Sequence, residues 1–126
     1  MRLLLDTHIL LWWLSDDPLL PPRARSLIVD PANAVFISPM TLWEIAIKAR
    51  LGKMTADVDE VRAEAANEGF IPLSFTADHA SEAARLPDYH RDPFDRALVA
   101  QARWEPLRLL THDGILAAYG DSVLLV

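Results

Sequence analysis

Short apolar segments alternate with longer, mixed segments along the whole chain. The short segments that are most continuously apolar lie at residues 1–5, 34–37, 107–110 and 122–126. Such runs are typical of strands that are buried on both faces of a sheet. Residues 70–73 form a further extended segment, but Pro72 places it at an edge or an end of the sheet, because a central strand needs every backbone N–H.

The segments between these strands carry the start and stop signals of helices. Ser38 followed by Pro39 is a typical helix start, and Gly52 is placed to end the same helix. Helices are expected over residues 9–14, 22–29, 39–51, 58–68, 77–86, 93–104 and 114–119. Strands that alternate with helices predict an α/β fold, with a short parallel sheet sandwiched between helices.

Length and composition restrict the class of protein. A chain of 126 residues is expected to form one domain, residues 1–126. It has no cysteine, no signal-peptide pattern, and no apolar run of the roughly 18 residues that span a bilayer, so we expect a cytoplasmic protein that does not enter a membrane. The net charge of −6 argues against a broad basic face for nucleic acid, although a small local basic rim stays compatible with it.

Four carboxylates occupy similar positions relative to the predicted strands. Asp6 ends the first strand, and Glu44 lies in the second turn of the helix after the second strand. Asp95 lies in the first turn of a later helix, and Asp113 follows the fourth strand. Right-handed crossovers bring the ends of parallel strands and the starts of the following helices to one edge of the sheet. We therefore expect these four acids to converge.

Each acid also has a purely structural interpretation, which is favoured when the acid is taken alone. Glu44 can pair with Lys48 at i, i+4 on a helix face. Asp92 can be a helix N-cap with Asp95 at the third helical position, and Asp113 can cap the short helix that follows it.

Taken together, the acids favour a metal site. Four carboxylates that meet without compensation repel one another, and a bound divalent cation removes this repulsion. The oxygen donors select Mg²⁺ or Mn²⁺, because the chain has no cysteine and its histidines are too scattered to indicate a metal cluster. The histidines are His8, His79, His90 and His112.

Four short motifs carry a resemblance to a known family. They are LLDT at residues 4–7, WEI at 43–45, DPFDRALVAQA at 92–102 and LTHD at 110–113. In this order and at this spacing, the chain resembles the PIN-domain ribonucleases, and specifically the toxins of VapBC-type toxin and antitoxin pairs. The resemblance implies a PIN fold, dependence on Mg²⁺ or Mn²⁺, endonucleolytic cleavage of RNA, a homodimer, and inhibition by a cognate antitoxin.

The resemblance also assigns site residues. The acidic residues of the family match Asp6, Glu44, Asp95 and Asp113, which are then the metal ligands, and Thr111 matches the family's hydroxyl near the last acid. Asp92 is an extra acid in the third motif, and its role stays open.

Metal-assisted hydrolysis of a phosphodiester bond is the expected mechanism. His8 and His112 lie near the acids in sequence and are candidates for moving protons, although both residues are also ordinary in loops and at helix starts. Four cationic residues have two possible roles. They either form a local basic rim that contacts RNA phosphates or simply lie on solvated helix faces; these residues are Lys48, Arg50, Arg91 and Arg96.

Trp12, Trp13 and Trp43 either fill the core or cover surface that a second subunit or an antitoxin segment buries. An antitoxin is expected to carry an apolar helix and an Arg that reaches the acids.

Two other classes of protein share part of this pattern. A Mg²⁺-dependent aspartyl phosphotransfer protein also places an Asp after its first strand, but it usually needs a Lys beyond a later strand, and the only lysines here are Lys48 and Lys53. A catalytically silent PIN-like domain that only binds a partner is the stronger alternative, and the presence of all four acids counts against it.

Overall fold

The computed structural model describes residues 1–126 and contains a five-stranded sheet. The strands are β1 (Arg2–Leu5), β2 (Ala34–Ile37), β3 (Ile71–Pro72), β4 (Arg108–Thr111) and β5 (Val123–Leu125). Their order in the sheet is β3-β2-β1-β4-β5, and every neighbouring pair is parallel. The predicted parallel α/β sheet is therefore confirmed, and the Pro-containing strand β3 lies at an edge.

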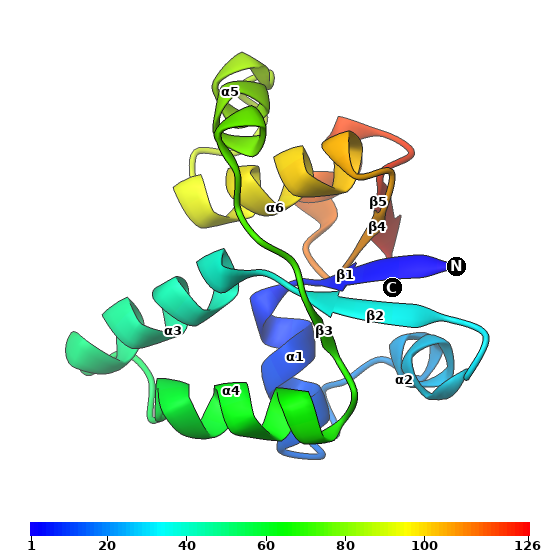
Figure 1. The fold of residues 1–126 in the computed structure, drawn as a ribbon, viewed down its shortest axis with the longest axis vertical. Helices are drawn as coiled ribbons and strands as arrows, with labels where there is room; N and C mark the ends of the chain where they lie inside the picture. Colours follow the sequence, from blue (N-terminus) through cyan, green and yellow to red (C-terminus); the bar gives the residue numbers. More distant parts are fainter.

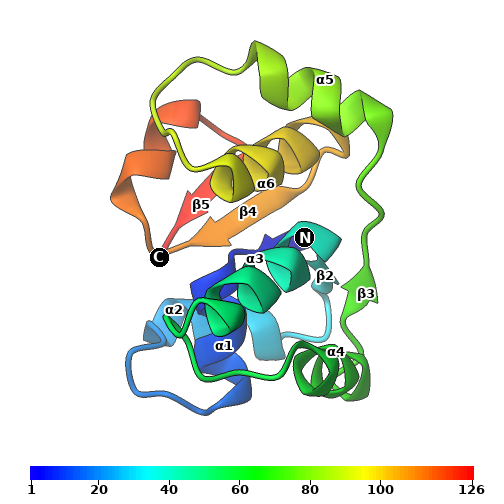
Figure 2. The ribbon, with the colours of Figure 1, turned by 90° about the vertical axis from the view of Figure 1, so that its left-hand side faces the viewer.

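Helices cover both faces of the sheet (Figures 1 and 2). One face carries α1 (Thr7–Leu14), α2 (Pro22–Val29), α3 (Pro39–Arg50) and α4 (Val58–Asn67). The other face carries α5 (Ala77–Arg85), α6 (Pro93–Trp104) and the short 3₁₀ helix η1 (Gly114–Tyr119). No helix combines the length and the hydrophobicity that a membrane crossing requires.

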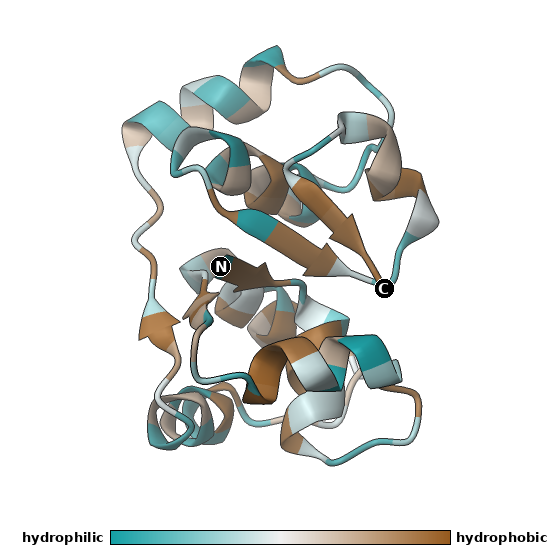
Figure 3. Cartoon of the chain, turned by 90° about the vertical axis from the view of Figure 1, so that its right-hand side faces the viewer, coloured by the Kyte–Doolittle hydropathy of each residue, from teal (hydrophilic) through white to brown (hydrophobic).

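The apolar side chains form one core on each face of the sheet. Successive residues of a strand point to opposite faces, so Leu3 and Leu5 of β1 enter the core beneath α1 to α4, while Leu4 enters the core beneath α5 and α6. Leu109 and Leu110 of β4 divide between the two cores in the same way. Because both faces are covered, the strands are apolar almost throughout (Figure 3).

The register of the central strands sets the position of the residues that follow them. Leu5 of β1 lies opposite Leu110 of β4, and the backbone N–H of Asp6 donates to the carbonyl of Leu110 at 3.0 Å. The chain therefore leaves β1 and β4 side by side, at Asp6 and at Thr111. Helix α3 begins after β2 at the same edge, where the hydroxyl of Ser38 accepts from the N–H of Met40.

Candidate metal centre

Asp6 lies at the end of β1 and is the N-cap of α1. Its Oδ1 accepts from the backbone N–H of Thr7 at 2.7 Å, and its Oδ2 accepts from the hydroxyl of Thr111 at 2.6 Å. Burial raises the pKa of the Asp6 carboxyl above its ordinary value of 3.8, although both hydrogen bonds act to lower it. Asp6 is thus a buried carboxylate whose two oxygens are held in fixed directions.

Glu44 projects from the second turn of α3 and is only 4% exposed. Its Oε1 accepts from the hydroxyl of Thr7 at 2.6 Å, and its Oε2 pairs with Nζ of Lys48 at 2.6 Å. The i, i+4 pair with Lys48 therefore forms, but Glu44 does not lie on a solvated face. The hydrogen bond to Glu44 raises the pKa of Lys48 and holds the cation beside the carboxylate.

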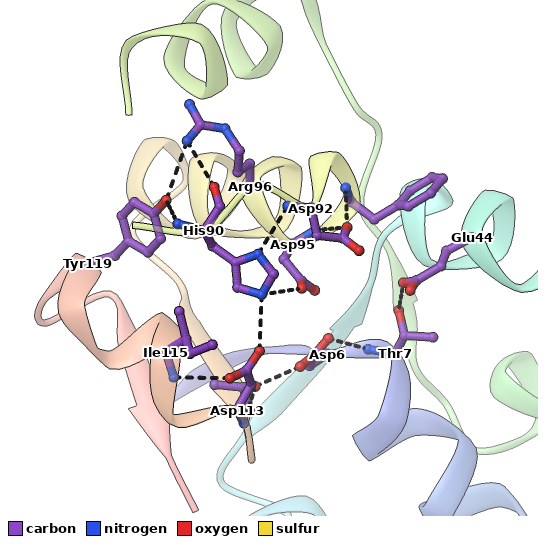
Figure 4. A network of polar contacts seen from close by, with 12 residues as sticks. Asp6, Thr7, Glu44, His90, Asp92, Asp95, Arg96, Asp113, Ile115 and Tyr119 are labelled. Atoms are coloured by element: carbon purple, nitrogen blue, oxygen red, sulfur yellow. Dashed lines mark hydrogen bonds and ion pairs between the residues drawn. The ribbon is translucent and has the colours of Figure 1, made fainter. Parts of the chain in front are cut away.

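Asp92 and Asp95 open helix α6. Oδ1 of Asp92 accepts from the N–H of Phe94 at 2.8 Å and from the N–H of Asp95 at 3.1 Å, so Asp92 is the N-cap of the helix. The side chain of Asp95 is 16% exposed and points toward the acids at the sheet edge (Figure 4).

The environment of Asp95 disfavours its charged form. Burial makes the largest contribution, followed by the charges of Asp6, Asp92, Glu44 and Asp113, and together they raise the pKa of Asp95 to about 8. The four acids that the sequence singled out therefore lie within electrostatic reach of one another.

Asp113 follows β4 and is the N-cap of η1, where its Oδ1 accepts from the N–H of Ile115 at 3.0 Å. Its own backbone N–H donates to the hydroxyl of Thr111 at 3.0 Å. Thr111 thus connects two acids, because its hydroxyl accepts from Asp113 and donates to Asp6.

His90 is the residue of this site that sequence reasoning missed. Its Nε2 lies 3.2 Å from Oδ2 of Asp95 and 3.2 Å from Oδ2 of Asp113 (Figure 4). These three side chains form a cluster whose ligand atoms all lie within 4.8 Å of one another. The histidines are scattered in the sequence and were not expected to indicate a metal cluster, but the fold brings His90 next to two of the acids. The only available signal was the position of His90 just before a helix that opens with two acids.

Arg96 lies neither on an RNA rim nor on a solvated helix face, the two alternatives that its sequence position left open. Its Nη2 donates to the carbonyls of Ala83 at 2.9 Å and Leu86 at 3.1 Å. Its Nη1 donates to the carbonyls of Pro87 at 3.0 Å and His90 at 3.3 Å. The guanidinium is only 16% exposed and ties the end of α5 and the following loop to α6, so it is not a free cation on the rim.

The remaining cations and histidines that the sequence singled out lie at the surface. Arg50 and Arg91 are exposed and form no hydrogen bond or ion pair through their side chains. His8 and His112 are also exposed, and the centroids of their rings lie 5.7 and 5.9 Å, respectively, from that of Trp12.

The donor set fits a hard divalent cation. The four acids offer carboxylate oxygens, which are the ligands that Mg²⁺ and Mn²⁺ take in proteins, and no sulfur is nearby because the chain has no cysteine. The crowding of like charges that raises the pKa of Asp95 is also what a cation would relieve. The residues present therefore suit such an ion.

Comparison with known proteins agrees with the fold. The family model of the PIN domain matches residues 3–121. No curated protein matches the chain in sequence.

Several solved structures are similar to this one over nearly their full length. VapBC2 from Rickettsia felis, crystallised with a DNA fragment of its promoter, has a TM-score of 0.67 at 16% identity, covering 100% of this chain and 98% of that chain. A toxin-antitoxin complex from Klebsiella pneumoniae has a TM-score of 0.64 at 25% identity, covering 96% and 94%. VapC20 of Mycobacterium tuberculosis, a toxin that cleaves the sarcin-ricin loop, has a TM-score of 0.59 at 20% identity, covering 94% and 95%.

These structural neighbours are a VapBC pair, a toxin-antitoxin complex and a VapC toxin, respectively. Since the family model covers almost the whole chain and the fold agrees with it, this protein belongs to the PIN domain family.

Proposed function

We propose that the protein is a Mg²⁺- or Mn²⁺-dependent endoribonuclease, which hydrolyses RNA phosphodiester bonds as the toxin of a type II toxin–antitoxin pair. The observation that carries the proposal is the meeting of four carboxylates from four separate elements at one edge of the sheet. Burial and four neighbouring acids disfavour the charge of Asp95, which supports a site built for a cation. Membership of a family of nucleases and similarity to VapC toxins support the proposal.

Asp6, Glu44, Asp95 and Asp113 would hold the ion. When bound, Mg²⁺ or Mn²⁺ supplies charge stabilisation for the scissile phosphate and makes water a stronger nucleophile at neutral pH. The protein supplies fixed geometry: Thr111 and the N–H of Thr7 orient the carboxylate of Asp6. Preorganised ligands of this kind need no rearrangement when the substrate arrives.

Three cations would contact the RNA backbone. Lys48 stays close to the site through its pair with Glu44, and Arg50 and Arg91 are exposed. Phosphate contacts of this kind position a nucleic acid without reading its sequence. A rim of a few cations suits a chain with a net charge of −6, because it confines attraction for RNA to the neighbourhood of the acids.

An antitoxin and a second copy of the chain would be the protein partners. The similar structures from Klebsiella pneumoniae and Rickettsia felis are a toxin-antitoxin complex and a VapBC complex, respectively. Trp43 is 62% exposed on α3, whereas Trp12 and Trp13 are partly buried against the core. An exposed Trp is unusual surface for a monomer and is enriched at interfaces.

Cleavage assays with cellular RNA test the proposal. Purified protein is incubated with total RNA in EDTA, Mg²⁺ or Mn²⁺, and new RNA ends are mapped. We expect cutting only with metal, and its loss in Asp6→Asn. Asp30→Asn is the matched control, because Asp30 is an exposed carboxylate that caps a turn through the N–H of Ala32.

Two results would count against the proposal. A folded Asp6→Asn variant that cuts at the same sites and rate would exclude the metal mechanism. Failure of wild-type protein to cut any RNA with either ion would instead favour a PIN-like domain that only binds a partner.

A further inference from the structure

His90 lies among the proposed metal ligands, yet its ring nitrogens have different roles. Nε2 faces the acids, at 3.2 Å from Oδ2 of Asp95 and 3.2 Å from Oδ2 of Asp113. On the other side of the ring, Nδ1 accepts a hydrogen bond of 3.0 Å from the backbone N–H of Asp92. A backbone amide can only donate, so the lone pair of Nδ1 is already engaged.

This contact fixes the tautomer of His90. With Nδ1 acting as an acceptor, the proton of the neutral ring is on Nε2. Nε2 then donates to Oδ2 of Asp113, and Oδ2 of Asp95 lies at the same distance from it (Figure 4). A nitrogen that carries a proton has no lone pair for a metal ion. Coordination through Nε2 would place the proton on Nδ1, where it would point at the N–H of Asp92.

The main chain around His90 is also held in place. The N–H of His90 donates to the hydroxyl of Tyr119 at 3.1 Å, and that hydroxyl donates to the carbonyl of Pro87 at 2.8 Å. The carbonyl of His90 accepts from Arg96 at 3.3 Å. Contacts from η1 and α6 thus fix both peptide groups of this residue, and they set the position from which its ring reaches the acids.

We propose that His90 is a positioning residue: its Nε2–H holds the carboxylates of Asp95 and Asp113 together in the orientation that the metal site needs, without itself coordinating the ion. The inference rests on the proposed metal-dependent function. Each carboxylate oxygen has two lone pairs, so Oδ2 of either acid can accept from His90 and still face a cation. Hydrogen bonds that orient metal ligands in this way typically change metal affinity by roughly 10- to 100-fold.

Three variants separate this role from direct coordination. His90→Leu removes the donor and is expected to weaken Mn²⁺ affinity by roughly 10- to 100-fold. His90→Gln keeps an N–H donor at the end of a side chain of similar reach, and is expected to restore most of the affinity. His112→Leu is the matched control, because His112 adjoins Asp113 in sequence but is exposed and bonds the carbonyl of Val126, so its loss should leave the affinity unchanged.

Spectroscopy reports on the ring itself. We expect pulsed electron paramagnetic resonance of Mn²⁺ bound to the wild-type protein to find no directly coordinated nitrogen. Nitrogen NMR of the Mg²⁺-loaded protein should show the Nε2–H tautomer for His90, assigned by the signals missing in His90→Gln. Circular dichroism and melting curves establish that each variant is folded.

Three results would overturn the positioning role, and they differ in what they leave intact. A coordinated nitrogen that disappears in His90→Leu would make His90 a ligand and overturn the positioning role. Unchanged Mn²⁺ affinity in folded His90→Leu would overturn the positioning role and leave the proposed function intact. Failure of the wild-type protein to bind Mn²⁺ would overturn both.

Discussion

The hydroxyl of Thr111 donates a hydrogen bond of 2.6 Å to Oδ2 of Asp6, and it joins the last residue of β4 to the residue that follows β1. The same oxygen accepts from the N–H of Asp113 at 3.0 Å, so one fully buried hydroxyl aligns two acids that follow neighbouring strands. This arrangement follows from the register of the sheet, in which Leu5 and Leu110 are paired.

Thr111→Val is expected to weaken the metal site. It removes the donor to Asp6 and the acceptor for the N–H of Asp113, and a hydrogen bond to a charged group contributes about 1.5–3 kcal/mol. We expect the pKa of Asp6 to rise further and Mn²⁺ binding at pH 7 to weaken at least tenfold, measured by calorimetry. Thr111→Ser retains the hydroxyl and should bind Mn²⁺ nearly as wild type does. Equal binding by the Val variant would show that this hydroxyl does not organise the site.

Asp95 gives the stability of the protein a particular pH dependence in EDTA. The ordinary pKa of its carboxyl is 3.8, and burial together with the surrounding acids raises it to about 8 in the folded protein. Between these values the folded state binds one proton more than the unfolded state, so the free energy of unfolding falls as the pH rises. The contribution of Asp95 to the free energy of unfolding is therefore fully present below about pH 4 and is lost once the pH exceeds about 8.

Urea denaturation in EDTA at pH 5, 7 and 8.5 tests this dependence. Asp95→Asn is the control, because an amide cannot ionise and should remove the part of the decline that belongs to Asp95. The raised pKa of Asp6 acts in the same direction in both proteins, so the difference between them reports Asp95. Parallel stability curves for the two proteins would contradict the raised pKa.

The convergence of the acids could be predicted from the sequence because it follows from topology. Asp6 and Asp113 end parallel strands, and the helix that carries Glu44 follows another, so one rule about crossovers brings them to a common edge. The edge position of β3 was predictable for a similar reason, because Pro72 cannot donate to a neighbouring strand.

The positions of His90 and Arg96 could not be predicted in this way. Arg96 follows Asp95 directly, but consecutive residues of a helix point about 100° apart, and the guanidinium turns away from the acids to bind carbonyls at the end of α5. His90 lies in a loop whose course depends on Arg96 and on Tyr119, which is distant in sequence. Contacts between separate segments of this kind leave no periodic pattern in the chain.

Trp43 is expected to contribute to association rather than to folding. Its side chain is 62% exposed on α3, so Trp43→Ser should change the free energy of unfolding of the monomer by no more than about 0.5 kcal/mol. Sedimentation at micromolar concentration should give a dimer for wild type and a larger monomer fraction for the variant. A wild-type protein that sediments as a monomer of 14.1 kDa would contradict the proposed homodimer.

Asp95→Asn also distinguishes a metal site from a set of helix caps. At pH 8.5 Asp95 is largely ionised, so if the four acids repel one another, neutralising one relieves the repulsion, and this variant should melt in EDTA at the same temperature as wild type or higher. Wild type should gain stability when Mn²⁺ is added, by about 2.7 kcal/mol at a hundredfold excess over Kd, because the ion binds only the folded state. The variant should lose most of this gain.

The capping interpretation makes the opposite forecast. Asp95 lies in the first turn of α6, where a carboxylate interacts favourably with the helix dipole by about 0.3–1 kcal/mol. If that were its only role, Asp95→Asn would melt at a lower temperature than wild type in EDTA and in Mn²⁺ alike, and neither protein would respond to the ion. Melting curves of both proteins across a Mn²⁺ titration at pH 8.5 therefore decide between the two roles, because only a cap predicts a lower melting temperature of the variant in EDTA and only a metal ligand predicts a response to the ion.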